Sequence, residues 1–110
     1  MEASNNGLKE FSLNDPAQKR KLAEFYNYKG VEQADEGNLM EALNYFNKAL
    51  QIDPMCKEAL FNRATIKADL GEFEEARKDF YQIGEINFLE KTDNQIQSFI
   101  TDQTPKINFF

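Results

Sequence analysis

The sequence contains two copies of one pattern, spaced 34 residues apart. Gly37 and Gly71 hold the same place in the two copies, and small or apolar residues recur at the same spacing on either side of them. The other matched pairs are Gly30 and Ala64, Leu39 and Phe73, Ala42 and Ala76, Phe46 and Phe80, and Ala49 and Ile83. Because residue size is kept in nearly every pair, chance is a poor explanation, and the chain is predicted to be a tandem structural repeat.

Each copy is predicted to be a pair of antiparallel helices. Apolar residues recur at three- and four-residue steps on both sides of the central glycine, which indicates α-helix. The close approach of the two helices needs small side chains where they cross. We expect Gly30 to cross Ala42 in the first copy, and Ala64 to cross Ala76 in the second.

Local signals place the ends of these helices. Asn38 is predicted to cap the helix that follows Gly37, with Glu41 three residues later completing a capping box. Asp53-Pro54 is predicted to end that helix, because the residue before a proline disfavours the helical conformation. Pro54 is expected at the first position of the next helix.

The 34-residue period, the small residues at the crossing, the glycine at the turn, the aromatic residue of the second helix and the closing Pro54 resemble the tetratricopeptide repeat. Repeat 1 covers about residues 23–56 and repeat 2 about residues 57–90. The chain departs from the family at Tyr26, where Trp is preferred, at Lys29 and Arg63, where Leu is usual, and at Phe88, where Pro is usual. The resemblance implies an all-α fold, a right-handed superhelical stack of antiparallel helix pairs.

The segments on either side of the repeats are predicted to extend the stack, giving a domain of residues 15–102 with about five helices. Asp15-Pro16 reads as an N-cap and a first helical residue, so the first helix is expected to gain about two turns. Thr92 and Gln95 form a capping-box pattern ahead of an apolar stripe, which predicts a separate capping helix over about residues 92–102.

The two ends of the chain fall outside this scheme. Residues 1–14 are polar and are expected to be loosely ordered. Residues 103–110 form a tail that is unusually apolar, ending in Phe109-Phe110. This tail either folds back or stays loose, or it docks in the groove of a neighbouring molecule and makes an oligomer.

Composition excludes several classes of function. The 110 residues carry a formal net charge of −6, which disfavours nucleic acid as a partner, because affinity for nucleic acid comes largely from Lys and Arg. A single cysteine, Cys56, rules out a disulfide within the chain and fits a reducing compartment. We see neither a signal peptide nor an apolar run long enough for a membrane. The expected location is cytoplasmic, with the nucleus not excluded.

The inventory of reactive groups argues against an enzyme. The chain has no His, the commonest general base and metal ligand. Cys56 therefore has no imidazole partner, and it is read as a small semi-buried residue. The acidic runs lack the alternating ligands and fixed glycine of a calcium loop. The glycines are isolated from one another, so the sequence contains no Gly-rich phosphate-binding loop. We expect no cofactor and no metal.

In the family that the chain resembles, the first helices of successive repeats line a concave groove that holds a peptide. The alternative is that these are ordinary solvated helix positions. An aromatic residue, an amide and an aspartate in each repeat would suit a partner with an apolar anchor and a basic residue. The matching positions are Asn27, Tyr28, Val31 and Asp35 in repeat 1, and Phe61, Asn62, Thr65 and Asp69 in repeat 2.

One subclass of the family binds the acidic tails of Hsp70 and Hsp90 through a carboxylate clamp of Lys, Asn and Arg. Asn62-Arg63 resembles the second repeat of such co-chaperones. The other clamp positions carry Asn27, Val31, Thr92 and Ile96. Because the required positive charges are missing, this chain is not expected to bind those tails.

Two hypotheses follow for function. The first is a non-enzymatic adaptor that binds a partner peptide or protein through the concave groove. The second is a structural protein that self-assembles through its short repeat stack and its apolar tail.

Overall fold

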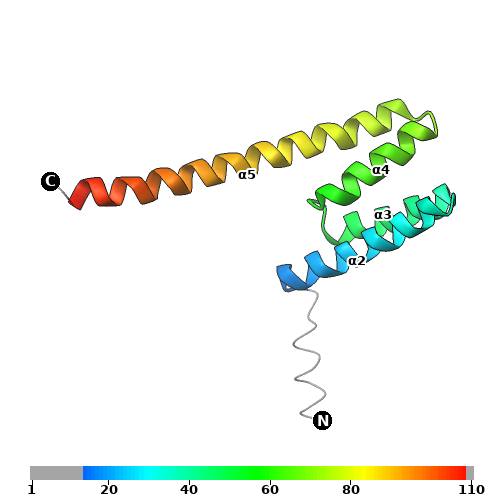
Figure 1. The fold of residues 1–110 in the computed structure, drawn as a ribbon, viewed down its shortest axis with the longest axis horizontal. Helices are drawn as coiled ribbons and strands as arrows, with labels where there is room; N and C mark the ends of the chain where they lie inside the picture. Colours follow the sequence, from blue (N-terminus) through cyan, green and yellow to red (C-terminus); the bar gives the residue numbers. More distant parts are fainter. Residues whose placement is uncertain (1–13, 109–110) are drawn as a thin grey trace, which may run out of the picture.

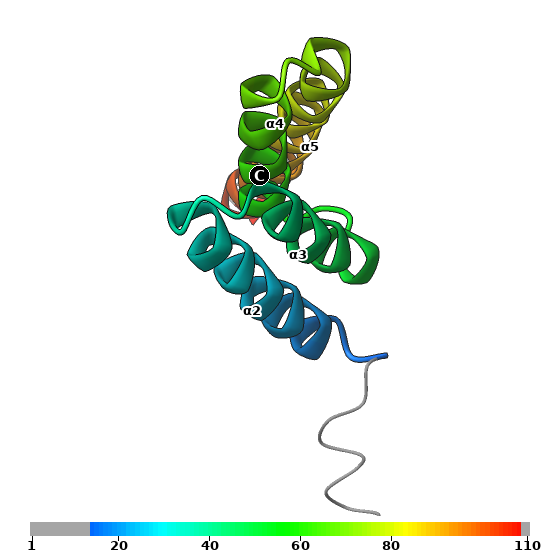
Figure 2. The same cartoon turned by 90° about the vertical axis from the view of Figure 1, so that its right-hand side faces the viewer.

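The computed structural model describes residues 14–108, and it folds into two helical hairpins (Figures 1 and 2). The first hairpin pairs α2 (Pro16–Asp35) with α3 (Leu39–Ile52), and the second pairs α4 (Lys57–Asp69) with α5 (Phe73–Asn108). The hairpins are joined because α4 packs against both α3 and α2. The all-α class and the paired helices are confirmed. Within the described residues there are four helices, however, and not five.

The start of the first helix is confirmed. Asp15 is its N-cap, and its carboxylate accepts a hydrogen bond from the Ala17 N–H at 3.0 Å. Pro16 is the first helical residue, where its missing N–H costs nothing. The helix therefore begins seven residues before the repeat at residue 23, which is about two turns.

The two glycines at the matched turns have the same conformation. Both Gly37 and Gly71 have a φ of 84°, a left-handed region that favours glycine. The hydrogen bonds around them also match: the Gly37 and Gly71 N–H groups donate to the third residue back, in each case at 3.0 Å. The repeat in the sequence is thus a repeat of backbone geometry.

One predicted cap is confirmed in position only, and another is wrong. Asn38 is the N-cap residue of α3, but its side chain makes no capping bond and donates to the Gln33 side chain at 2.9 Å. Pro54 does not open a helix. It lies in the turn after α3, where the Asp53 carboxylate accepts from the Met55 N–H, and α4 begins three residues later at Lys57 with Cys56 as its N-cap.

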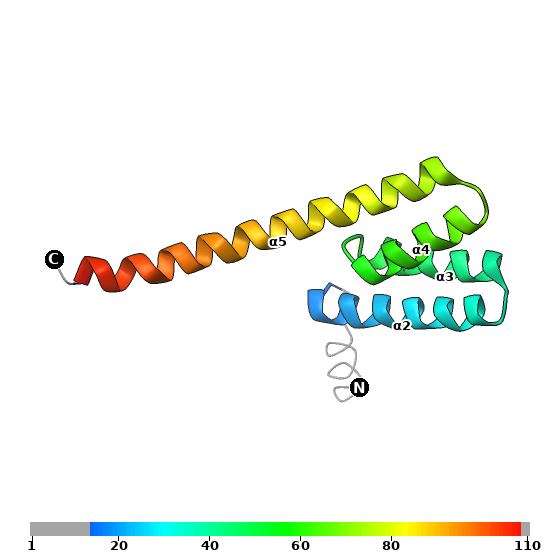
Figure 3. The same ribbon diagram turned by 45° about the horizontal axis from the view of Figure 1, so that its top comes forward.

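The separate capping helix over residues 92–102 is also wrong, because these residues belong to α5. Thr92 does not cap a helix, since its hydroxyl donates to the Phe88 carbonyl one turn earlier in the same helix. Repeat 1 is closed by Asp53-Pro54, whereas repeat 2 has Asn87-Phe88 at the matching place. With no proline there to stop it, α5 runs for 36 residues. It projects well beyond α4 (Figure 3).

The core has two clusters of buried side chains. Phe46 is the largest side chain of the smaller cluster and is 1% exposed. Gly30 lies directly against its ring, because a Cβ added at Gly30 would come within 2.5 Å of a Phe46 ring carbon. The larger cluster joins the two hairpins and is formed by Ala23, Ala49, Leu50, Cys56, Ala59, Leu60 and Ile86.

The loose N-terminal segment predicted for residues 1–14 lies almost entirely outside the described residues. Of the predicted tail 103–110, residues 103–108 continue the backbone of α5, and Phe109-Phe110 lie outside the description. In the described part of the chain, no helix combines the length and the apolarity that crossing a bilayer requires.

Candidate partner-binding groove

The site is built where α2 and α4, the first helices of the two repeats, contact each other. Asn27 on α2 and Asn62 on α4 meet there. The side-chain amide of Asn62 donates to the side-chain oxygen of Asn27 at 2.9 Å, and both residues are half-buried. This bond fixes both amides while leaving the second N–H of Asn62 and the N–H groups of Asn27 for other acceptors.

Phe61 stands beside this amide pair with 55% of its surface exposed. Its ring meets Phe80 of α5 edge to face, with the ring centroids 5.8 Å apart. That contact holds the ring in one orientation without burying it. An exposed and oriented aromatic ring next to a fixed amide offers a partner both an apolar contact and hydrogen bonds.

An open hollow of about 360 Å³ lies over these residues. Three of the eight predicted residues, Asn27, Phe61 and Asn62, line it together. The sequence reasoning did not name the other three lining residues, which are Lys57, Glu58 and Ile83. A signal for two of them was present, because Lys57 and Glu58 lie one helical turn before Phe61 and Asn62 on the same face of α4.

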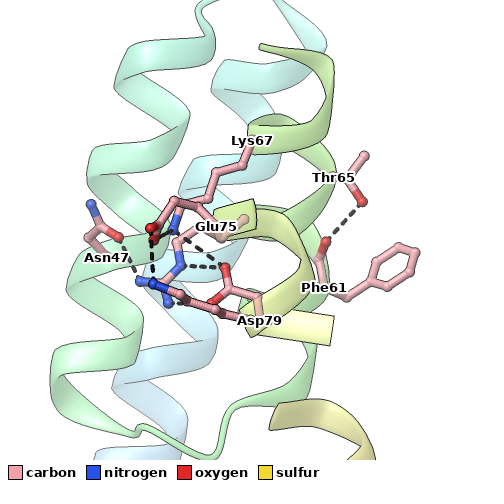
Figure 4. A network of polar contacts seen from close by, with 8 residues as sticks. Asn47, Phe61, Thr65, Lys67, Glu75 and Asp79 are labelled. Carbon is pink, nitrogen blue, oxygen red and sulfur yellow. Dashed lines mark hydrogen bonds and ion pairs between the residues drawn. The ribbon is translucent and has the colours of Figure 1, made fainter. Parts of the chain in front are cut away.

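The other five predicted residues lie outside the hollow. Tyr28 is 60% exposed on α2. Val31 packs against the core cluster of Phe46. The Thr65 hydroxyl donates to the Phe61 carbonyl at 2.9 Å, within its own helix (Figure 4). Asp35 and Asp69 are exposed at the last positions of α2 and α4.

Charge in the hollow is mixed. The Lys57 ammonium is engaged by two groups of α5, the Glu90 carboxylate at 2.7 Å and the Asn87 side-chain oxygen at 3.1 Å. Glu58 is exposed, and its carboxylate accepts a weak hydrogen bond from the Cys56 thiol, with sulfur and oxygen 3.9 Å apart. With Lys57 already paired, Glu58 is the charge of the hollow that remains for a partner, and it favours a basic group.

A partly buried ion network ties α4 to α5 outside the hollow. The Arg63 guanidinium donates to both oxygens of Asp79, each at 2.8 Å, and to the Asn47 side-chain oxygen of α3 at 2.9 Å. Lys67 lies 3.7 Å from the same Asp79 carboxylate, as Figure 4 shows. Asp79 is only 4% exposed. Arg63 stands where Leu is usual in the family, so the polar pair takes the place of an apolar contact.

Cys56 is buried at the start of α4 and is 5% exposed. Burial raises the pKa of its thiol above the ordinary value, although the Ala59 backbone N–H acts in the opposite direction. The group is therefore a neutral thiol at physiological pH. Within residues 14–108, no three His, Cys, Asp or Glu side chains are grouped so that they could hold a metal ion.

We predict that this thiol reacts slowly with a disulfide reagent such as DTNB. Because the thiolate is the nucleophile and the sulfur is covered, labelling of the folded chain at pH 7.5 should be slower than in the unfolded chain by about tenfold or more. Stopped-flow absorbance with and without denaturant measures this ratio. Equal rates in the two states would show that Cys56 is exposed in solution.

Comparison with known proteins matches both halves of this arrangement to one family. The tetratricopeptide-repeat pattern matches residues 23–56 and again residues 57–88. The "Uncharacterized protein MJ0572" of Methanocaldococcus jannaschii is 45% identical over 62 residues, which are 56% of this chain and 72% of that protein. The second match ends two residues before the boundary at residue 90 that the sequence predicted.

Two longer relatives carry the family in their names. The "Tetratricopeptide repeat protein 36 homolog" of Nematostella vectensis is 33% identical over 67 residues, which are 61% of this chain and 37% of that protein. The "TPR repeat-containing protein MJ0940" of M. jannaschii is 42% identical over 72 residues, which are 66% of this chain and 21% of that protein. The chain thus spans less than two fifths of either of these two relatives.

Proposed function

The chain belongs to the tetratricopeptide-repeat family, and we propose that it is a non-enzymatic adaptor that binds a partner peptide or protein in the hollow between α2 and α4. Repeats of this family mediate protein interactions. One observation carries the proposal here: the exposed Phe61 ring stands beside the hydrogen-bonded Asn27–Asn62 pair at an open hollow. Apolar and amide groups converging in one concave place are typical of a recognition site.

The chemistry of the hollow suggests the kind of segment that binds. The face of the Phe61 ring suits an apolar anchor. The fixed amides of Asn27 and Asn62 suit the backbone of an extended segment, because an amide both donates and accepts. The exposed carboxylate of Glu58 suits a Lys or Arg next to the anchor. Tyr28 and the two aspartates at the helix ends would extend the same surface.

The acidic tails of Hsp70 and Hsp90 remain poor candidates. Of the clamp positions named above, Asn62 alone keeps the clamp residue, and its amide already binds Asn27. Thr92 and Ile96 lie on α5, so they do not belong to the first helix of a third repeat. The one lysine of the hollow, Lys57, is paired with Glu90.

Peptide selection tests the proposal directly. We would select binders from a displayed random-peptide library against the full chain, and measure each selected peptide by fluorescence anisotropy. The double variant Phe61→Ala/Asn62→Ala should bind these peptides at least tenfold more weakly, because it removes the apolar contact and the fixed amide together. The selected peptides should share an apolar residue close to a basic one.

The matched control is Tyr81→Ala, which removes an exposed aromatic ring of α5 that lies outside the hollow. Both variants must keep the helical circular dichroism of the wild type. Peptides that bind the double variant as tightly as the wild type would disprove the groove as the site. A library that yields no binder would disprove peptide recognition itself.

Self-assembly remains the second candidate function, and one observation favours it. Phe46 is 1% exposed, whereas Phe80 at the matching position of repeat 2 is 42% exposed. The end of the stack therefore keeps apolar surface that another element would cover. The predicted role of the apolar tail in this assembly rests on side chains outside the structural description.

A further inference from the structure

Two of the residues that line the hollow between α2 and α4 carry a charge, Lys57 and Glu58. The Lys57 ammonium lies 2.7 Å from a carboxylate oxygen of Glu90, and it donates to the side-chain oxygen of Asn87 at 3.1 Å. Both of these partners belong to α5, and neither of them lines the hollow. The charge that the hollow presents is therefore decided in part by residues outside it.

Asn87 and Glu90 lie beside Lys57 because α5 continues past the place where its counterpart in repeat 1 ends. The helix α3 ends at Ile52, and the matching residue of repeat 2 is Ile86, which lies inside α5. Asn87 and Glu90 follow within the next turn, three residues apart, so they are neighbours on one side of the helix. Ile86 is buried in the core cluster that joins the hairpins, which fixes this part of α5. The unbroken helix thus places two acceptors at the start of α4.

The matching positions of repeat 1 hold no such pair. Lys57 corresponds to Ala23 and Glu90 to Cys56, and both of these residues are buried in the larger core cluster. The Lys57–Glu90 pair is therefore not a feature of the repeat itself. Its side chains are 35% and 53% exposed, and a pair this exposed contributes little to the stability of a fold. Its larger effect is on the charge at the hollow.

The pair changes which partner the hollow can take. A free ammonium at Lys57 would attract an acidic segment. In the structure, an incoming carboxylate must displace two acceptors and approach the negative charge of Glu90, so it is repelled. Glu58 keeps its negative charge, because the thiol that bonds to it is neutral. Lys57, Glu58 and Glu90 together leave one negative charge, which favours a basic segment.

We propose that Glu90 makes the hollow selective for a basic partner segment. By holding Lys57, it keeps that cation from binding an acidic segment and leaves Glu58 to bind a Lys or Arg. Glu90 acts through Lys57, so it is a positioning residue and not a contact of the partner. The inference rests on the proposed function, because it concerns the segment that binds in the hollow. It adds the cause of the charge preference, which is the continuation of α5 past Ile86.

A charge series in a bound peptide tests this role. We would take a peptide selected by the wild-type chain and prepare versions with Lys, Gln and Glu at its basic position. By fluorescence anisotropy, the wild type should bind the Lys version more tightly than the Glu version by about fivefold or more. In Glu90→Gln this ratio should fall by about threefold or more, because the released Lys57 attracts Glu and repels Lys. An unchanged ratio in Glu90→Gln overturns the proposal.

The matched control is Glu85→Gln, which removes the same charge from the same helix. Glu85 lies beside Tyr81 and Phe88 and outside the hollow. At physiological ionic strength, exposed charges more than about 8 Å apart are largely screened, so this variant should keep the ratio of the wild type. Both changes are at exposed side chains, and both variants should keep the wild-type circular dichroism. An equal fall in the two variants would mean that net charge sets the preference, and it would overturn the role of Glu90.

A second change shows whether Glu90 acts through Lys57. The double variant Lys57→Gln/Glu90→Gln removes both charges of the pair and leaves Glu58. Its preference for the Lys version should therefore return close to that of the wild type. A purely structural role of Glu90 would not be rescued by the loss of its partner. A double variant that keeps the altered ratio of Glu90→Gln overturns the link through Lys57.

A proline at position 88, where the family usually has one, tests the part played by the unbroken helix. Proline inside a helix removes a hydrogen bond, and it disfavours the helical conformation of the preceding residue, Asn87. Phe88→Pro should therefore separate Glu90 from Lys57 and lower the ratio as Glu90→Gln does. Phe88 is 67% exposed, so the loss of its ring leaves the core in place. An unchanged ratio in Phe88→Pro would contradict the dependence on an unbroken α5.

The proposed function and the role of Glu90 fail in different ways. If no peptide is selected, or if Phe61→Ala/Asn62→Ala binds the peptides as tightly as the wild type, the hollow is not the site and both proposals are overturned. If that variant loses the peptides while Glu90→Gln keeps the wild-type ratio, the hollow binds the partner and the role of Glu90 alone is overturned.

Discussion

Replacing Asp79 by alanine is expected to lower the free energy of unfolding by about 3–5 kcal/mol. Asp79 is 4% exposed, and both of its oxygens accept hydrogen bonds from Arg63 at 2.8 Å. Its removal leaves the guanidinium largely covered and without its anion. Removal of one partner of a buried pair costs much more than the pair itself contributes. A domain of this size has only about 5–15 kcal/mol in total, so a large part of the stability would be lost.

Urea unfolding followed by circular dichroism measures this loss, and a second ion pair supplies a matched control. Arg77 and Glu74 are also 2.8 Å apart, but their side chains are 70% and 79% exposed. Glu74→Ala should therefore cost less than about 1 kcal/mol, since exposed pairs contribute little. Equal losses in Asp79→Ala and Glu74→Ala would show that burial does not set the strength of the Arg63–Asp79 pair.

The double variant Arg63→Leu/Asp79→Leu distinguishes a lost interaction from an orphaned charge. Leu is the residue that the family usually has at the position of Arg63. If the cost of Asp79→Ala comes from the unpaired guanidinium, the apolar pair should recover most of the stability. A double variant as unstable as Asp79→Ala would mean that the pair itself, with its bond to Asn47, supplies the stability.

This network also shows what the sequence predicts poorly. The 34-residue period predicted the two hairpins, because residues at matched positions of a repeat adopt the same local conformation. Gly37 and Gly71 indeed share a φ of 84°. Arg63 was visible as a departure from the usual Leu and as part of the clamp-like Asn62-Arg63 pair, but not as an ion-pair partner. Its partner Asp79 lies 16 residues away on another helix, and that pairing depends on how the helices pack.

The positions where the helices end were also difficult to predict from the sequence. The sequence contained a proline to end α3, and it contained no comparable breaker near Phe88. A capping-box pattern at Thr92 nevertheless suggested a new helix. Thr92 satisfies its hydroxyl by bonding the carbonyl of Phe88, which a threonine inside a helix does readily. A capping-box sequence caps a new helix only where the preceding helix has ended. No residue near Phe88 ends α5, so Thr92 remains inside it.

The site was predictable in type and less so in detail. The helical period placed Asn27, Phe61 and Asn62 on one face, and they line one hollow. Val31 lies on the core instead, because the residue that follows Gly30 is close enough to the helix crossing to be drawn into the cluster of Phe46.

The 34-residue period also gave Phe46 and Phe80 matching positions in the two repeats. Their exposures differ because α4 supplies Ile66 to the cluster of Phe46, and no following repeat covers Phe80 in the described residues.

Gly30→Ala is expected to destabilise the chain by about 1–3 kcal/mol, although alanine is normally the better helix former by about 1 kcal/mol. The added Cβ would lie 2.5 Å from a ring carbon of Phe46, closer than such atoms approach. A flexible side chain would give way, but Phe46 is 1% exposed and enclosed by Ala42 and Ile66. The helices α2 and α3 must therefore separate, and the packing of the first hairpin is lost.

Gly84→Ala is the control, because a Cβ on that helical glycine meets nothing within 4 Å. Measured at a concentration where the chain is monomeric, it should stabilise the fold by up to about 1 kcal/mol. The same substitution would thus have opposite signs at two glycines. The pair Gly30→Ala/Phe46→Leu should lose less than the sum of its single changes, because leucine removes the ring that the new methyl group strikes. A strictly additive double variant would place the steric conflict of Gly30 elsewhere than at Phe46.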